Sequence, residues 1–438
     1  MNSYQQRWAG PVIEKIRELA EWANLRKEQG VTGFDGELEE LGRAVERVAA
    51  KMRCFRPAAG YEAAQPSGLA EIRRQRPAGP RVMAKPSLMG YRRRLHGAVL
   101  GRAAGCLLGS IVEFWSIEDM ENWARYVGDA FPPVDYWSAI KDPTGTRYSV
   151  SRREGYTRSK MTCMEADDDL IYTWLGLLIL EDYGIDFTTK DVGEAWKKYL
   201  PLACTAEKVA LENLNAGVPP EKAGEVNNPY ITWIGADIRS DPWGYVCPGM
   251  PEKAAELAHR DAYISHREYG IHGEMFFSAA IAAAFAVDDP MKAIEIGLTE
   301  IPANCRMAGD VKWALDTMDS VKGYRDARQK VEARFEGLSG VHTGPNAALT
   351  IFALRLGRKD FTRTIGECVA MGLDNDCTAA TAGSILGAVI GVDNVPAHWY
   401  RPFNNKVHTY IKGHEWMALD DLLARFERIG ARTGGLQS

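Results

Sequence analysis

The fold class follows from HGAVLGRAAGCLLG (residues 96–109) and CTAATAGSILGAVIG (residues 377–391), two apolar stretches rich in Gly and Ala. Three further stretches between them have the same character: LIYTWLGLLILEDYG (170–184), EMFFSAAIAAAFAV (274–287) and NAALTIFALRLG (346–357). Turns rich in Gly, Pro and Asn separate these stretches, and alternating strand-like runs are few, which is the pattern of buried helices. We therefore predict one all-α domain over residues 91–438, with tightly packed central helices.

Residues 1–90 follow a different pattern. Residues 1–53 predict a helical extension of two short helices, and the second helix has one apolar stripe. That stripe consists of Leu38, Leu41, Val45, Val48 and Met52. Residues 54–90 are rich in Pro and Gly and predict a linker. Because nine Lys and Arg stand against two Glu over residues 54–96, this segment is expected either to lie on an acidic body or to contact a polyanion.

Composition narrows the functional classes. The 438 residues include 53 Lys and Arg and 58 Asp and Glu, which gives a net charge of −5 and argues against a general nucleic-acid binder. No apolar stretch reaches the roughly 18 residues of a membrane span, and the first residues do not resemble a secretory signal. The eight cysteines are scattered without a CxxC pair, so we expect reduced thiols and a cytoplasmic protein.

Two acidic clusters each precede an apolar helix. Asp167, Asp168 and Asp169 come directly before the helix at 170–184. One Asp is a good helix cap, but three neighbouring carboxylates repel one another unless a cation neutralises them. Asp374 and Asp376 open the helix at 377–391, where an irregular turn would let both carboxylates converge.

Either cluster alone fits a solvated helix cap. Two clusters that both lead into buried helices favour a metal site, because buried carboxylates are costly unless they are paired or bind a cation. Oxygen ligands favour Mg²⁺, Mn²⁺ or Ca²⁺, and five carboxylates suit two ions. Cys377 follows Asp376 directly and fits a buried small residue better than a nucleophile, because no histidine is near it in the sequence.

Three motifs within residues 91–392 resemble the ADP-ribosylglycohydrolase family, which includes the dinitrogenase-reductase-activating glycohydrolases. GAVLGRAAGCLLGSIVEF is similar to the glycine-rich first helix of that family, with Gly109 and Glu113 in its Gly-x-x-x-Glu step. EADDDL stands where the family has Thr-Asp-Asp-Thr, and GLDNDCTAATAG where it has Gly-Gly-Asp-Thr-Asp-Thr. A looser match over residues 248–285 includes His266 and the glycine-flanked helix entry at Gly273.

The resemblance implies an orthogonal multi-helix bundle with two divalent cations, Mg²⁺ or Mn²⁺. The metal ligands that it implies are Asp167, Asp168, Asp169, Asp374, Asp376 and Cys377. It implies Glu113 as the general acid or base. Asp167 is the next candidate, because it is an acid that stands where the family has Thr. It places Gly109, Ser110, His266 and Gly273 at the substrate. The substrate would be ADP-ribose-like, either a small molecule or linked to a protein, and the bond at ribose C1 would be cleaved.

The chain departs from the family motifs at several positions. Asp167, Leu170 and Cys377 stand where the family has Thr, and Cys106 stands where many members have Asp. Residues 228–249, NPYITWIGADIRSDPWGYVCPG, replace a Gly-Asn-Gly-Ala-x-Met-Arg pattern. There Trp233 could stack on a base and Asp237 could accept from an amino group, although Trp233 also fits a core anchor.

Three functions remain open on the sequence. The first is a metal-dependent hydrolase of an ADP-ribosylated or nucleotide-like substrate. The second is a non-catalytic ADP-ribose-binding or crystallin-like structural relative, and the third is a small-molecule N-glycosidase of a biosynthetic pathway. The retained acids favour the hydrolase, whereas the changes at the Thr positions favour the other two.

Overall fold

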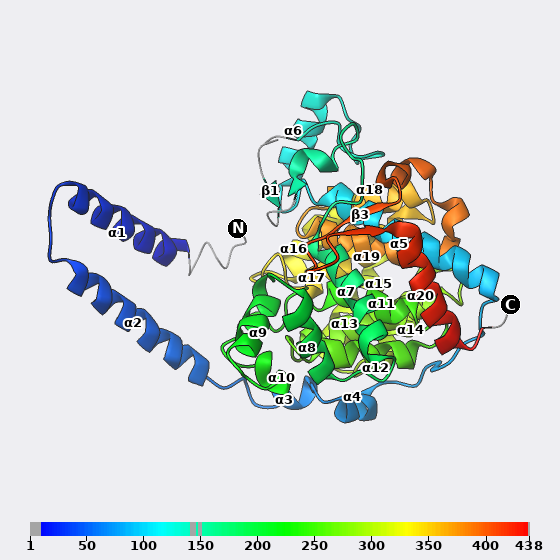
Figure 1. The fold of residues 1–438 in the computed structure, drawn as a ribbon, viewed down its shortest axis with the longest axis horizontal. Coiled ribbons are helices and arrows are strands. Elements are labelled where there is room, and N and C mark those ends of the chain that lie inside the picture. The colour runs from blue at the N-terminus through cyan, green and yellow to red at the C-terminus, as the bar shows by residue number, and fades with distance from the viewer. Residues whose placement is uncertain (1–9, 141–145, 148–150, 437–438) are drawn as a thin grey trace. The chain divides into compact units, whose positions relative to one another are not determined.

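The computed structural model describes residues 10–140, 146–147 and 151–436. Helices make up 64% of the structure and strands are almost absent, so the predicted all-α fold class is confirmed (Figure 1). The helices are α1 (Gly10–Glu28), α2 (Asp35–Cys54), α3 (Tyr61–Ala64), α4 (Leu69–Gln75), α5 (Leu88–Gly109), α6 (Ile117–Val127), α7 (Asp168–Tyr183), α8 (Thr189–Tyr199), α9 (Thr205–Asn215), α10 (Pro220–Ala223), α11 (Asp241–Tyr245), α12 (Pro251–Ala262), α13 (Tyr269–Ala284), α14 (Pro290–Gly297), α15 (Arg306–Thr317), α16 (Tyr324–Arg334), α17 (Thr343–Gly357), α18 (Phe361–Ala370), α19 (Asn375–Ile390) and α20 (Leu419–Gly434).

The described residues also form four short strands and several short 3-10 helices. β1 (Thr146–Arg147) pairs antiparallel with β2 (Ser151–Arg152), and β3 (Lys406–His408) pairs antiparallel with β4 (Trp416–Ala418). Strands of two or three residues leave no alternating pattern in the sequence. In the described residues, no helix has both the length and the hydropathy that a bilayer crossing requires.

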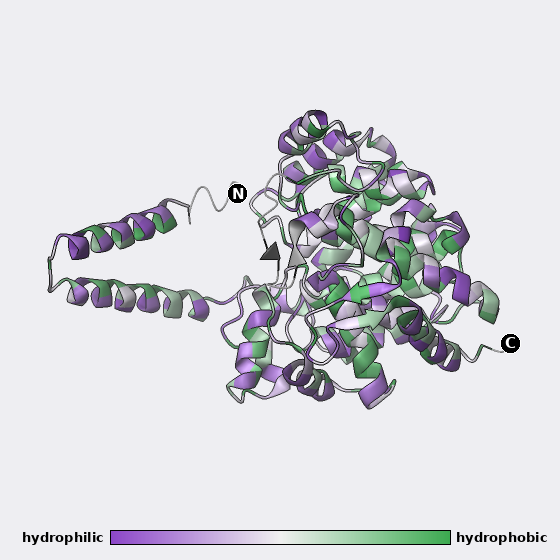
Figure 2. Ribbon diagram, turned by 45° about the horizontal axis from the view of Figure 1, so that its top comes forward, coloured by the Kyte–Doolittle hydropathy of each residue, from purple (hydrophilic) through white to green (hydrophobic). Residues whose placement is uncertain are grey.

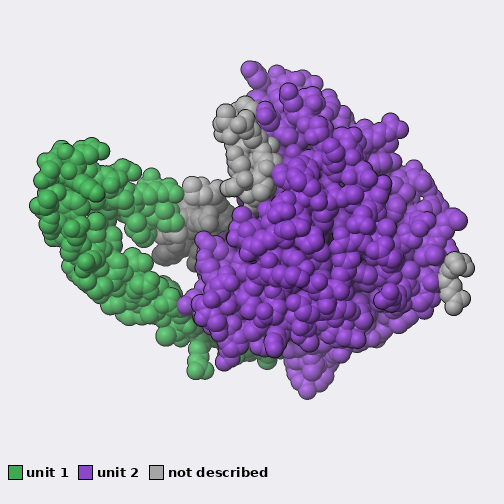
Figure 3. Space-filling view, in the orientation of Figure 1, with its two compact units in different colours: residues 1–63, 335–340 green, residues 64–334, 341–438 purple. Residues whose placement is uncertain are grey.

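The chain divides into two compact units, residues 1–63 with 335–340 and residues 64–334 with 341–438 (Figure 3). In the first unit, α1 and α2 form where the apolar periodicity predicts helices. Both helices carry hydrophobic and hydrophilic residues along their length (Figure 2), and neither contains a buried residue. The boundaries after residues 53 and 90 stay predictions.

Ion pairs and histidines hold the basic segment at the start of the second unit. Arg76 and Arg81 both pair with the buried carboxylate of Glu300, at N–O distances of 2.6 and 2.7 Å. These pairs favour the first of the two expectations for this segment, contact with an acidic body. His272 of α13 contacts the Pro66 carbonyl (2.7 Å), and burial lowers the pKa of His272 to about 4.

Acid is expected to weaken this attachment. The pKa of His272 is about 4 in the fold against an ordinary 6.5, so the unfolded chain binds more protons between these values. Stability is therefore lost as the pH falls from 6.5 toward 4. At pH 5, His272 alone is expected to lower the free energy of unfolding by about 2 kcal/mol. His272→Gln cannot ionise, so its unfolding free energy should fall less than the wild type between pH 7 and 5 in urea titrations. Parallel pH profiles would contradict this assignment.

The antiparallel pair of α5 and α19 forms the centre of the second unit. Gly97, Gly101, Gly105 and Gly109 recur every fourth residue of α5 and face the backbone of α19. A Cβ atom at Gly109 would lie 2.5 Å from the Cα atom of Asp376. Because these glycines have no side chain, the C-terminal end of α5 can lie directly against the N-terminal end of α19. Two of the predicted motifs lie at these two ends.

Gly105→Ala is expected to destabilise the fold. Its Cβ atom would overlap the carbonyl oxygen of Ala379, and overpacking of a buried contact costs about 1–3 kcal/mol. Gly309→Ala in α15 is the matched control, because a Cβ atom there meets nothing within 4 Å and alanine is the better helix former by about 1 kcal/mol. Urea unfolding should place the two variants on opposite sides of the wild type.

Candidate metal centre

Ligand atoms from three distant motifs converge where α5 ends and where α7 and α19 begin. They fall into three groups, and within each group the ligand atoms lie within 4.8 Å of one another. The groups are Glu113, Asp374 and Asp376; Asp169, Asp376 and Cys377; and Cys106, Asp167 and Asp169. Asp169 and Asp376 each belong to two groups, so the groups form one continuous cluster.

The turn before α19 aims its carboxylates at Glu113. Gly372 and Leu373 both have left-handed backbone angles, with φ of 71° and 64°. The amide of Phe114 donates to the Leu373 carbonyl (3.0 Å), which fixes the segment after α5 against this turn. The irregular turn expected before the helix therefore brings Asp374 and Asp376 together with the half-buried Glu113.

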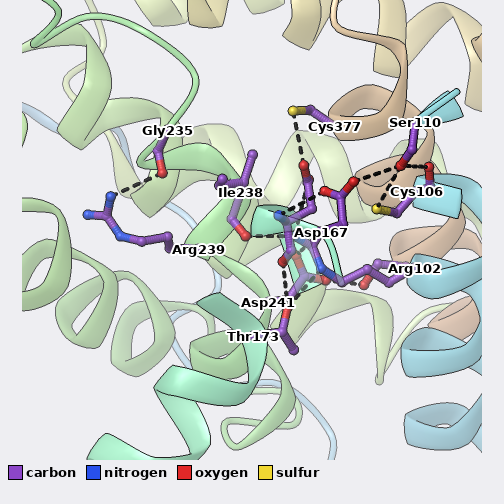
Figure 4. A network of polar contacts seen from close by, with 12 residues as sticks. Arg102, Cys106, Ser110, Asp167, Thr173, Gly235, Ile238, Arg239, Asp241 and Cys377 are labelled. Atoms are coloured by element: carbon purple, nitrogen blue, oxygen red, sulfur yellow. Dashed lines mark hydrogen bonds and ion pairs between the residues drawn. The ribbon is translucent and has the colours of Figure 1, made fainter. Parts of the chain in front are cut away.

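The start of α7 uses its three aspartates differently. Asp167 is the N-cap, and its carboxylate accepts from the amide of Asp169 (3.2 Å) and from the hydroxyl of Ser110 (2.7 Å). Asp168 is half-buried, whereas Asp167 and Asp169 are fully buried. The Cys377 thiol donates to Asp169 Oδ2 (3.2 Å), which links α7 to α19 (Figure 4).

A buried arginine of α5, Arg102, lies beside Asp241 and Thr173 (Figure 4) and also contacts Asp169. Arg102 of α5 is 1% exposed and donates to Asp241 Oδ2 (2.6 Å), to the Asp169 carbonyl (2.8 Å) and to Thr173 Oγ1 (2.9 Å). Its Nη2 atom lies 3.4 Å from Asp169 Oδ1. Burial alone would lower the pKa of Arg102, but Asp241 and Asp169 outweigh it and raise that pKa.

The carboxylates fit a divalent cation. Asp374 is 3% exposed, and its Oδ1 atom has no hydrogen-bond partner among the described residues. Burial and the nearby Asp376 and Glu113 raise the pKa of Asp374. Burial also raises the pKa of Asp169, and Asp376 and Asp167 add to this effect although Arg102 opposes it. A cation would relieve this repulsion and take up the orphaned oxygen.

A family model of ADP-ribosylglycohydrolases matches residues 87–431. The chain belongs to the ADP-ribosylglycohydrolase family. A solved structure described as an ADP-ribosylglycohydrolase-related protein complex is 19% identical, with a TM-score of 0.53, and the match covers 79% of this chain and 99% of that one. This likeness supports the fold alone. No curated protein matches the sequence.

Three of the residues that the family resemblance places at the substrate lie beside buried carboxylates. Gly109 and Ser110 are in contact with the carboxylate cluster, through Asp376 and Asp167. A Cβ atom at Gly273 of α13 would lie 3.2 Å from Asp237 Oδ1, and this buried oxygen has no hydrogen-bond partner among the described residues. Burial and Asp241 raise the pKa of Asp237.

Trp233 and His266 have other neighbours. Trp233 is half-buried and contacts Tyr230 edge to face (4.6 Å between ring centroids). Its backbone forms an isolated antiparallel β-bridge with His342. His266 is fully buried, and its Nδ1 atom lies 2.8 Å from Ser265 Oγ. Contact of these two side chains with a substrate stays a prediction for this member of the glycohydrolase family.

The sequence patterns identify neither Cys106 of the cluster nor the neighbouring Arg102 as a site residue. Cys106 was noted only as a departure from the family motif, yet it belongs to a ligand group. The available signal for Arg102 is a charged residue within the otherwise small and apolar residues 97–109, because a buried charge requires a partner.

Proposed function

We propose that this chain is a hydrolase that depends on divalent cations and cleaves the glycosidic bond at ribose C1 of an ADP-ribosylated or nucleotide-like substrate. Membership of the ADP-ribosylglycohydrolase family supports a hydrolase that acts on ADP-ribose-like molecules. The observation that carries the proposal is the position of Glu113, whose carboxylate lies within 4.8 Å of ligand oxygens of Asp374 and Asp376.

The residues divide into holding and proton-moving groups. Asp374, Asp376 and the aspartates of α7 would hold two cations, Mg²⁺ or Mn²⁺, and Asp376 could serve both because it belongs to two ligand groups. Bound cations would supply charge stabilisation at the ribose and an activated water. Glu113 would take a proton from the attacking water or give one to the leaving group.

Other side chains would position the substrate. Gly109 leaves room beside Asp376, and Ser110 orients Asp167 by its hydrogen bond. Asp237 and Trp233 would contact the base or the leaving group. We propose the cytoplasm as the compartment, because scattered cysteines without disulfide-type spacing suit a reducing environment.

A substrate panel tests the proposal. Purified protein would be incubated with ADP-ribosyl-arginine, ADP-ribosyl-serine, NAD and nucleosides, each with Mg²⁺ or Mn²⁺ and with EDTA, and the released ribose product would be quantified. We expect cation-dependent release from at least one ADP-ribosyl substrate. Turnover of free nucleosides alone would favour the small-molecule N-glycosidase. Binding of ADP-ribose without turnover of any substrate would favour the non-catalytic relative.

A further inference from the structure

The second helix of the first unit, α2, exposes an apolar seam. Its large apolar side chains recur at alternating steps of three and four residues, which is the heptad spacing of a coiled coil. Four of these five side chains are between 41% and 62% exposed, and α2 contains no buried residue. Most of the stability of such a helix comes from packing of its apolar face, so the seam requires a partner. The residues of the α2 seam are Leu38, Leu41, Val45, Val48 and Met52.

Short side chains border the middle of the α2 seam. The first, third and fifth seam residues take the a positions of a heptad abcdefg, and the other two take the d positions. Gly42 and Ala49 therefore occupy e positions, and Ala44 occupies a g position. Glu37 and Lys51 occupy the two outer g positions. The small residues let two helices approach closely, and the charged g residues set the choice and direction of the partner.

Charge is distributed unevenly along α2, which favours an antiparallel partner of the same sequence. Residues 35–42 contain four acidic residues and no basic one, whereas residues 43–54 contain four basic residues and one acidic one. In an antiparallel pair, the acidic half of each helix faces the basic half of the other. The g positions then face each other, so Glu37 of one copy lies opposite Lys51 of the second copy. A parallel pair would bring Lys51 beside Arg56 instead, and these like charges repel.

The first helix, α1, adds further apolar surface to the same unit. It contains no buried residue, and six of its large apolar side chains are between 39% and 58% exposed. Two copies of α1 and α2 together supply four helices, the number of a four-helix bundle, and the connection between α1 and α2 is as short as those in such bundles. The exposed side chains of α1 are Val12, Ile13, Ile16, Leu19, Trp22 and Leu25.

We propose that α1 and α2 form a dimerisation module, in which a second copy of this chain covers the α2 seam with its own seam in the antiparallel direction. Leu41 of each copy then packs against Val45 of the other, and the acidic and basic halves of the two helices complement each other. The inference is independent of the proposed function, because all the ligand groups of the carboxylate cluster lie in the second unit.

The mass of the full chain in solution tests this pairing. Size-exclusion chromatography with light scattering over a dilution series should give twice the 48.5 kDa of one chain. Val45→Glu places an unpaired carboxylate in the seam, so the Kd of the dimer should rise by about 10²-fold or more. Ala50→Glu is the matched control, because it adds the same charge at an exposed position on the opposite face of α2. Its Kd should stay close to that of the wild type.

Lys51→Glu tests the direction of the pair. In the antiparallel dimer the introduced carboxylate faces Glu37, so dimerisation should weaken severalfold. Adding Glu37→Lys to the same chain exchanges the two charges and should restore the wild-type Kd. In a parallel dimer the introduced carboxylate would face Arg56, and Lys51→Glu would strengthen dimerisation.

Three results would overturn the proposal. A wild type that stays monomeric throughout the dilution series would leave the α2 seam to a different protein. A Val45→Glu dimer as tight as the wild-type dimer would place the contact elsewhere on the chain. A Lys51→Glu dimer tighter than the wild-type dimer would contradict the antiparallel direction. The wild-type mass and the charge exchange keep the test decisive even if Val45→Glu unfolds α2.

Discussion

Asp374→Asn is expected to abolish hydrolysis while the chain stays folded. Asp374 lies at the N-cap position of α19 but makes no capping hydrogen bond with its side chain, so the amide removes no helix cap. The substitution does remove a candidate metal ligand, because Asp374 shares a ligand group with Asp376. Metal stabilisation of a transition state is worth several kcal/mol, and about 1.4 kcal/mol is a factor of ten, so kcat/KM should fall by about 10³-fold or more.

Asp360→Asn is the matched control for this variant. Asp360 is the N-cap of the neighbouring α18, where its carboxylate accepts from the Arg363 amide (2.8 Å), and asparagine caps helices equally well. Its activity should equal that of the wild type. Because burial, Asp376 and Glu113 all raise the pKa of Asp374, Asp374→Asn should also be at least as stable as the wild type in EDTA. Near-normal turnover in Asp374→Asn would remove this residue from the site.

Glu113→Gln is expected to lower kcat by about 10²–10⁴-fold, the usual contribution of general acid–base catalysis. The glutamine keeps the shape of the side chain but cannot accept the proton. KM should change little, because the carboxylates of α7 and α19 still hold the substrate-binding cations. Steady-state kinetics on the best substrate of the panel would measure the two constants separately.

Glu118→Gln is the control for Glu113→Gln. Glu118 lies in the first turn of α6 and pairs with Arg325 on the surface (3.0 Å), so its loss should leave kcat unchanged. Should Glu113→Gln retain the wild-type kcat, the proton carrier is a different group. Asp167 would then be the next candidate, although it already caps α7 and accepts from Ser110.

Much of the fold could be predicted because burial leaves a strong pattern. Each of the five apolar stretches lies wholly or mostly in one helix, and these helices are α5, α7, α13, α17 and α19. The glycines of α5 predicted tight packing, but a single sequence does not identify the partner of a helix face. Pairing of Gly101 with Gly383 and of Gly105 with Ala379 is a property of the assembled bundle.

The carboxylates of the candidate site were predictable from their mutual repulsion, whereas their neighbours were not. Arg102 contacts Asp169 and Asp241, which lie 67 and 139 residues further along the chain. A similar buried arginine, Arg239, pairs with Glu207 and Asp261. Such partners come from separate helices, so no local periodicity connects them. The same limit applies to Cys106, whose position beside Asp167 depends on how α5 meets α7.

The stability of the fold with and without a divalent cation tests the central claim most directly. A ligand that binds only the folded state at 100 times its Kd adds about 2.7 kcal/mol of stability. Thermal unfolding of the wild type should therefore shift upward when Mn²⁺ or Mg²⁺ replaces EDTA, and the same exchange should leave the midpoint of Asp374→Asn much less changed. A wild-type midpoint that is identical in EDTA and in excess cation would contradict the claim that these carboxylates form a metal centre.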